Sequence, residues 1–181
     1  MRYAHDLGDL NSVAFAMRMR LVPLRNLGAC ISPDNAWMFL QGIETLALRM
    51  QRHCENSMKV AKYLENHKQV EWVRYPGLEN DPVNKIAKKY LHNGFGSVVV
   101  FGIKGGIKKG ENFIDNLKLL SHLANVGDAK SLAIHPASTT HSQLSEENQL
   151  KGGIKPELIR LSIGIENIDD IIADIEQSLN S

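Results

Sequence analysis

Cysteine is scarce in this chain, and the two cysteines that occur form no recognisable pair. Cys30 and Cys54 lie far apart in the 181-residue sequence, and neither belongs to a CxxC motif. The sequence therefore predicts neither a disulfide framework nor a thiolate metal site. A reducing cytoplasm is the expected compartment.

Long apolar runs are also missing. The first ten residues, MRYAHDLGDL, lack the apolar stretch of a signal peptide. No run elsewhere approaches the ~18 apolar residues of a membrane-spanning helix. We therefore expect no membrane-embedded segment.

Neither sign of charge is in excess. Lysine and arginine number 21 against 20 aspartates and glutamates, which gives a net charge of +1 and a pI near 7.8. This balance argues against a dedicated nucleic-acid surface. A hydrophobic content of 43% and a charged content of 23% are typical of a soluble globular protein with one or two small domains.

The hydrophobic pattern predicts an α/β sandwich. Four runs have strand character and are expected to form a mainly antiparallel four-stranded sheet, namely 70–76, 97–104, 129–136 and 158–166. Helical spacing marks further segments that are expected to cover one face of the sheet, namely 11–27, 33–66, 82–90, 111–123 and 167–179.

The segment 33–66 is unusually long for one helix. Unbroken, it would span about 50 Å at 1.5 Å per residue. The alternative is two helices with a break near His53. Ser32 and Pro33 have the character of an N-cap and a first helical residue.

A single arginine interrupts the last predicted strand. Strand periodicity places Ile159, Leu161, Ile163 and Ile165 on one apolar face and Arg160 on the other, between small residues. A solvent-facing charge explains this pattern, and so does a guanidinium that captures a carboxylate in a bidentate manner.

Several competing motifs fail. GIKGGIKKGE has the glycine spacing of a phosphate loop, but Glu111 stands where the lysine is required, so a strand-to-helix turn is favoured. His135 and His141 lack the further ligands of a metal site and are interpreted as loop histidines in local hydrogen bonds. Ser138, His141 and Asp128 have the residue types of a hydrolase triad but no nucleophile elbow.

Three motifs carry a family resemblance. GDAKSL, HPASTTH and LIRLSIGIE, in this order, resemble the C-terminal portion of the Cys/Met-metabolism family of pyridoxal-phosphate (PLP) enzymes, and O-acetylhomoserine sulfhydrylases most. The resemblance implies the small C-terminal domain of a fold-type I PLP enzyme. It implies that 1–66 form the end of the large domain and the linking helix, and that 67–181 form the small domain.

The resemblance also implies roles for three residues. An arginine in the position of Arg160 binds the α-carboxylate of the amino-acid substrate. Asn125 helps to bind the same carboxylate, and Thr140 matches a threonine near that site. Lyase relatives carry serine at the position of Asn125, which favours the sulfhydrylases.

PLP chemistry requires a lysine for the Schiff base, and the family places it in a Ser-x-x-Lys context. None of the 13 lysines follows a serine at this spacing. The chain is therefore interpreted as a fragment that is inactive alone and contains neither catalytic nor cofactor-binding residues.

The resemblance implies that the parent enzyme is a homo-oligomeric PLP-dependent transferase. It makes homocysteine, or methionine, and acetate from O-acetylhomoserine and sulfide, or a thiol. Two alternatives stay open: a fragment of a cystathionine γ-synthase or γ-lyase, and a non-catalytic binding or assembly module.

Overall fold

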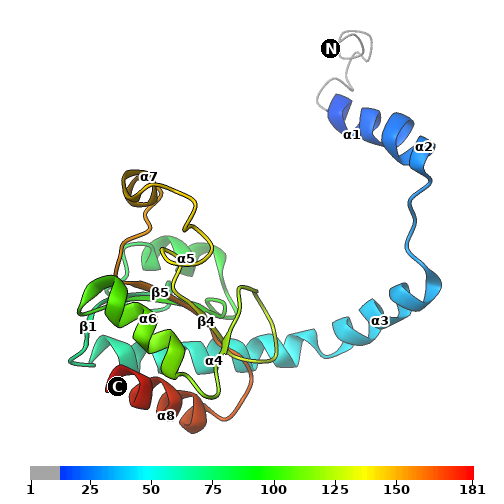
Figure 1. Cartoon of the computed structure of the whole chain (residues 1–181). Helices are drawn as coiled ribbons and strands as arrows, with labels where there is room; N and C mark the ends of the chain where they lie inside the picture. Colours follow the sequence, from blue (N-terminus) through cyan, green and yellow to red (C-terminus); the bar gives the residue numbers. More distant parts are fainter. Residues whose placement is uncertain (1–12) are drawn as a thin grey trace. The chain divides into compact units, whose positions relative to one another are not determined.

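The computed structural model describes residues 13–181. The N-terminal segment MRYAHDLGDL and the start of the helix predicted for 11–27 lie outside the described residues. The chain divides into two compact units, Met1–Glu44 and Thr45–Ser181 (Figure 1).

The first unit is helical throughout its described length apart from a short connection. Its elements are α1 (Ala14–Met19), a π-helical turn η2 (Arg20–Leu24), α2 (Arg25–Leu27) and α3 (Pro33–Glu44). Pro23 lies in the π-helical turn, because proline has no N–H for the regular ladder. Gly28 ends α2 in the left-handed conformation. The helix predicted for 11–27 therefore ends at Leu27 as expected, and a π-helical turn interrupts it.

The start of α3 follows the predicted cap, but the long helix is broken elsewhere than expected. The Ser32 hydroxyl accepts a hydrogen bond from the backbone N–H of Asn35 at 3.2 Å. The next helix, α4 (Leu46–Glu65), begins after Thr45, whose φ of −102° and ψ of 3° lie outside the helix. Both the single helix and the break near His53 are therefore wrong. His53 lies inside α4, and its buried ring bonds the carbonyl of Ile163 at 2.6 Å.

The second unit contains a mixed five-stranded sheet in the order β1-β2-β5-β4-β3. Its strands are β1 (Val70–Arg74), β2 (Val98–Ile103), β3 (Ser121–His122), β4 (Leu132–Ile134) and β5 (Leu158–Ser162). Each of the four predicted runs contains one strand, and these four pair antiparallel. The expected number of four is wrong, because β3 adds a fifth strand parallel to β4.

The predicted end of the last strand is also corrected. β5 stops at Ser162 rather than at Glu166. Beyond it, the carbonyls bond to side chains of α4: His53 donates to the carbonyl of Ile163, and Asn56 donates to those of Gly164 and Glu166. The N–H of Ile163 still bonds the carbonyl of Ser97, just before β2. The side chains of His53 and Asn56 lie about 110 residues earlier in the sequence, so no local pattern signals them.

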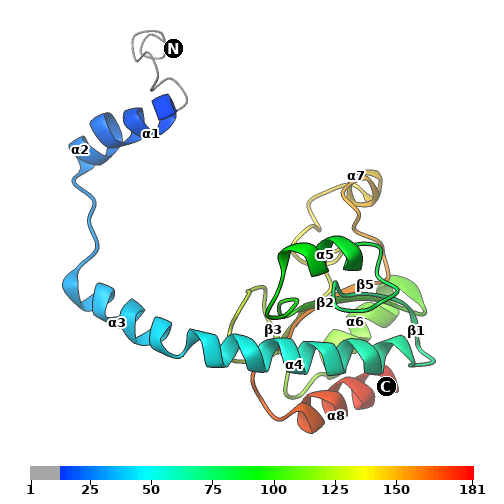
Figure 2. The same cartoon turned by 180° about the vertical axis from the view of Figure 1, so that it is seen from behind.

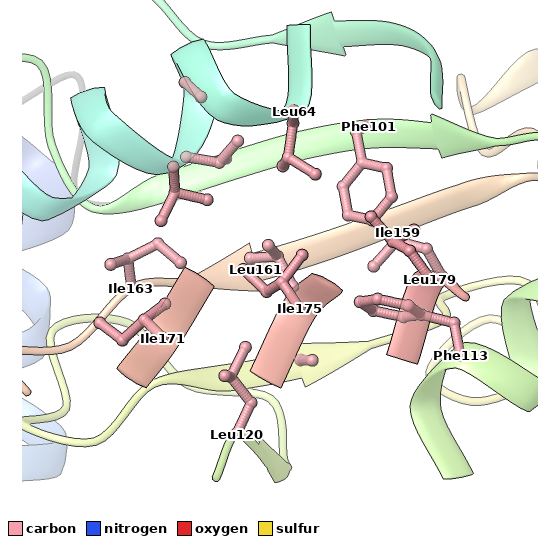
Figure 3. Close-up of a cluster of buried hydrophobic side chains, with 14 of the residues drawn as sticks. Leu64, Phe101, Phe113, Leu120, Ile159, Leu161, Ile163, Ile171, Ile175 and Leu179 are labelled. Atoms are coloured by element: carbon pink, nitrogen blue, oxygen red, sulfur yellow. The ribbon is translucent and has the colours of Figure 1, made fainter. Parts of the chain in front are cut away.

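Three helices share one hydrophobic core with one face of the sheet. They are α4, α6 (Gly106–Asn116) and α8 (Ile168–Leu179). Figure 3 shows Leu64, Phe113 and Ile175 pointing into the same space as the sheet residues, and α4 runs beside α8 in Figure 2. The predicted alternation in β5 is confirmed for Ile159, Leu161 and Ile163, which are fully buried.

The helix predicted for 111–123 begins and ends earlier. It starts at Gly106, after a strand-to-helix turn in which Gly105 has a φ of 108°, and it ends at Asn116. The buried carboxylate of Asp174 on α8 accepts the backbone N–H groups of the next segment, those of Lys118, Leu119 and Leu120, at 2.8–3.0 Å. These N–H groups therefore bond to the Asp174 carboxylate instead of to helical carbonyls, and the chain leaves the helix and continues into β3.

Two short helices complete the unit. They are α5 (Asn84–Tyr90) and α7 (Glu146–Lys151), the latter in a segment for which no helix is predicted. The last helix is capped by the Asn167 side chain, which accepts from the N–H of Asp169 at 2.9 Å. Within residues 13–181, no helix combines the length and the apolar character needed to cross a membrane.

We predict that Asp174→Ala destabilises the second unit. Three backbone donors lose a charged acceptor in a buried setting, so the free energy of unfolding should fall by about 3 kcal/mol. Asp174→Asn, which keeps one carbonyl oxygen, is the matched control and should cost less. Urea denaturation of the chain measures both, and equal costs for the two variants would contradict this account.

Candidate functional site

Arg160 lies in the middle of β5, on the face of the sheet opposite the core. Its backbone is paired with Val100 of β2 on one side and with Ile134 of β4 on the other. The residue is half-buried, and its Nη2 donates a hydrogen bond to the backbone carbonyl of Asn125 at 3.1 Å. The guanidinium is therefore fixed at its base by two neighbouring strands and at its tip by a loop.

The charge of Arg160 has no acidic partner among the described residues. The bond to the Asn125 carbonyl is the one hydrogen bond that its guanidinium makes within residues 13–181, and it forms no ion pair there. The contrast with Arg74 of β1, whose Nε bonds Asp81 at 3.0 Å, is direct. Arg160 thus retains free N–H donors in a planar fork, the arrangement that suits a carboxylate.

Asn125 reaches the site from the loop of residues 123–131, which joins β3 to β4. The residue is exposed, and its side-chain oxygen accepts from the backbone N–H of Val126 at 2.8 Å. The structure therefore brings Arg160 and Asn125 into contact through a backbone carbonyl. The contact joins positions 35 residues apart.

Thr140 makes no hydrogen bond to either residue in the described part of the chain. It is exposed in the turn after β4, where its hydroxyl lies 2.8 Å from Nδ1 of His141. His135 is buried and bonds Ser138 and the carbonyl of Pro156 at 2.8 and 2.7 Å. The interpretation of both histidines as locally bonded is confirmed. The Ser138 hydroxyl meets His135 rather than His141, so the triad is not formed.

A second set of polar contacts, which sequence reasoning missed, lies beside the loop. The carboxylate of Glu166 accepts the backbone N–H of Ser131 at 2.6 Å and the Ser131 hydroxyl at 2.9 Å. That hydroxyl in turn accepts the N–H of Gly164 at 2.8 Å. These contacts join residues 33 and 35 positions apart. Glu166 stands next to the helix cap Asn167, and nothing in the local sequence indicates that its carboxylate bonds Ser131.

Gly164 allows this close approach. A Cβ added there would lie 2.4 Å from the carbonyl oxygen of Ala129 and 2.6 Å from the carbonyl carbon of Lys130. Both are backbone atoms and cannot rotate away. The segment after β5 therefore packs directly on the end of the 123–131 loop, and a side chain at this position would separate them.

Known proteins resemble this chain over almost its whole length. A family model described as Cys/Met metabolism PLP-dependent enzyme matches residues 8–180. The chain belongs to this family. The predicted resemblance is confirmed over nearly the whole sequence.

Relatives of this PLP-dependent family member are close. The chain is 55% identical over 175 residues to the O-acetyl-L-homoserine sulfhydrylase of Leptospira meyeri, which covers 96% of the chain and 39% of the relative. It is 52% identical to the homocysteine synthase of Schizosaccharomyces pombe, covering 99% of the chain and 41% of the relative. The chain thus spans about two fifths of the relatives that it matches.

A solved structure of the family shows the same fold. It is a crystal structure from Campylobacter jejuni assigned as an O-acetylhomoserine (thiol)-lyase, with a pyridoxyl-lysine monophosphate. The TM-score is 0.84 at 46% identity, and the match covers 92% of this chain and 40% of that one.

The lysines of this PLP-dependent family member do not fit the cofactor's attachment site. Every lysine in the described residues is exposed except Lys109, which is half-buried and bonds the terminal carbonyl of Ser181. A Schiff-base lysine needs a sheltered position in which its amine is deprotonated. None of these lysines therefore has the surroundings of a Schiff-base lysine.

We predict that Gly164→Ala strains the contact between the two segments. The backbone atoms of Ala129 and Lys130 must move to admit the methyl group, so the free energy of unfolding should fall by about 2 kcal/mol. Gly152→Ala, where the added Cβ would meet its nearest atoms at 3.4 Å, is the matched control. Thermal denaturation of both variants measures this, and a Gly164→Ala variant as stable as the control would disprove the strain.

Proposed function

We propose that this chain forms the part of a PLP-dependent O-acetylhomoserine sulfhydrylase that binds the substrate α-carboxylate. The two relatives reported above are named for this activity or for homocysteine synthesis. The proposed reaction joins O-acetylhomoserine with sulfide, or a thiol, and releases acetate. Asn125, rather than serine, at the loop position favours this assignment over the lyase relatives.

The observation that carries the proposal is the state of Arg160. Arg160 lies on a central strand, its guanidinium is held at the tip by a carbonyl, and it has no acidic partner in the described residues. The contact with Asn125 is exposed, so a ligand can reach the N–H groups that the carbonyl leaves free. An amino-acid carboxylate provides two oxygens in the plane that the free N–H groups require.

The chain's contribution to the reaction is orientation. When bound, PLP supplies the electron sink for the amino-acid substrate. Arg160 would hold the carboxylate in a fixed plane, and the side chain of Asn125 would take part from the loop. The substrate's remaining bonds are then set in direction relative to the reacting centre. Positioning of this kind is worth several kcal/mol of the barrier.

We assign Thr140 a secondary role in the same site. Its hydroxyl is exposed and meets only its neighbour His141 in the described residues. The turn of residues 136–144 is rich in small polar side chains. A movement of this turn toward Arg160 would place the hydroxyl near the substrate and would exclude water.

The first unit supports membership of a larger protein. On α3, four consecutive apolar residues are all more than half exposed, namely Trp37, Met38, Phe39 and Leu40. Four consecutive residues point in all directions around a helix. A helix that is apolar all round is normally buried, so we infer that α3 packs inside the complete enzyme. Division into a large-domain end with linking helix at 1–66 and a small domain at 67–181, and assembly into a homo-oligomer, are parts of the same proposal.

We predict that Arg160→Ala in the complete enzyme raises the KM for O-acetylhomoserine. Loss of a bidentate charge-assisted pair should cost roughly a hundredfold, while the KM for sulfide stays within about twofold. Arg160→Lys keeps the charge but removes the planar fork, so it should restore only part of the loss. Steady-state kinetics with each substrate varied separately measure these effects.

The control for this experiment is Arg74→Ala. Arg74 pairs with Val100 on the same face of the sheet, but its guanidinium is neutralised by Asp81. The KM for O-acetylhomoserine should not change in this variant. An unchanged KM in Arg160→Ala would remove Arg160 from the site and would overturn the proposed function.

A further inference from the structure

The loop that carries Asn125 has little regular structure to fix it. β3, which precedes it, contains only two residues, and residues 121–126 are all exposed. Within the loop, Gly127 adopts a φ of 77° and Asp128 accepts the N–H of Lys130 at 3.1 Å, which shapes the turn but does not attach it to the protein. Its position therefore depends on what holds its far end.

That far end is bonded to the segment that follows Arg160. Ser131 is fully buried and makes three hydrogen bonds there: its N–H and hydroxyl donate to Glu166, and its hydroxyl accepts from Gly164. The N–H of Ile165 adds a fourth contact, to the carbonyl of Ala129 at 2.9 Å. Two of these four contacts end on one carboxylate, which makes them charge-assisted and therefore stronger than neutral bonds.

Glu166 is itself held in place by α4. The side chain of Asn56 is buried and donates to the carbonyls of Gly164 and Glu166 at 3.1 and 3.0 Å. The path from α4 through Asn56, Glu166 and Ser131 to the 123–131 loop is thus continuous. The loop returns to β5 where the Asn125 carbonyl meets Arg160.

We propose that Glu166 is a positioning residue for the carboxylate site. This assignment rests on the proposed function. Glu166 holds the 123–131 loop so that the Asn125 carbonyl accepts a hydrogen bond from Nη2 of Arg160. The remaining N–H groups of the fork are then turned toward the substrate. Glu166 acts on the substrate only through Ser131, the loop and Arg160.

The test uses kinetics of the complete enzyme. Glu166→Ala should raise the KM for O-acetylhomoserine about tenfold, because even a small displacement of the guanidinium weakens its hold on the carboxylate. The KM for sulfide should stay within about twofold. Glu166→Gln keeps one carbonyl acceptor for Ser131 and should give a smaller rise. A merely structural role would lower the melting temperature and kcat but would not move one KM selectively.

The matched control is Glu157→Ala. Glu157 is also a partly buried carboxylate next to β5, but it precedes the strand and accepts from Trp72 Nε1 at 3.1 Å. Its loss should leave the KM for O-acetylhomoserine unchanged. Should Glu166→Ala fold poorly, Ser131→Ala removes only the hydroxyl contacts, and it should raise the same KM by about threefold.

A double-mutant comparison decides whether Glu166 acts through Arg160. In an Arg160→Ala background, Glu166→Ala should cause no further rise in KM, because effects along one path are not additive. A rise as large as in the native background would overturn the positioning role. The same is true if Arg160→Ala raises the KM and neither Glu166→Ala nor Ser131→Ala does. If Arg160→Ala itself has no effect, the proposed function fails instead.

Discussion

The structure depends on the burial of one face of β5. Ile159, Leu161 and Ile163 lie fully buried against α4, α6 and α8, and the pairing of β5 with β2 and β4 places it inside the sheet. Because side chains alternate in direction along a strand, this burial forces Arg160 onto the opposite face. The position of the charged group is therefore a consequence of the hydrophobic core and not a separate device.

Hydrogen bonds between residues far apart in the sequence then position the segments that lie outside the hydrophobic core. Asp174 ends α6 by accepting the N–H groups of 118–120, and this turns the chain into β3 and toward the 123–131 loop. Asn56 and Glu166 hold the other side of that loop. Each contact satisfies backbone groups that no regular element would satisfy, so each sits where a strand or helix stops.

The proposed site likewise combines a rigid strand with an irregular loop. β5 provides a rigid base for Arg160, and a loop without regular structure provides Asn125. A rigid base fixes the direction of the guanidinium, and the loop lets a single carbonyl occupy one donor while the others stay available. In the proposed carboxylate-binding role, this arrangement requires no lysine and no cofactor contact from these residues.

The sequence by itself determined the family, the four antiparallel strands, the apolar face of β5 and the assignment of Arg160 to the other face, because these are set by motifs and by periods of two and 3.6 residues. It failed where the deciding partner is remote. The break at Thr45, the early end of α6, the fifth strand and the stop of β5 at Ser162 each depend on contacts or conformations that no local pattern specifies. The meeting of Arg160 with the Asn125 carbonyl and the bonds from Ser131 to Glu166 were decided by tertiary structure alone, since hydrogen bonds between residues about 35 positions apart leave no periodic trace in a chain.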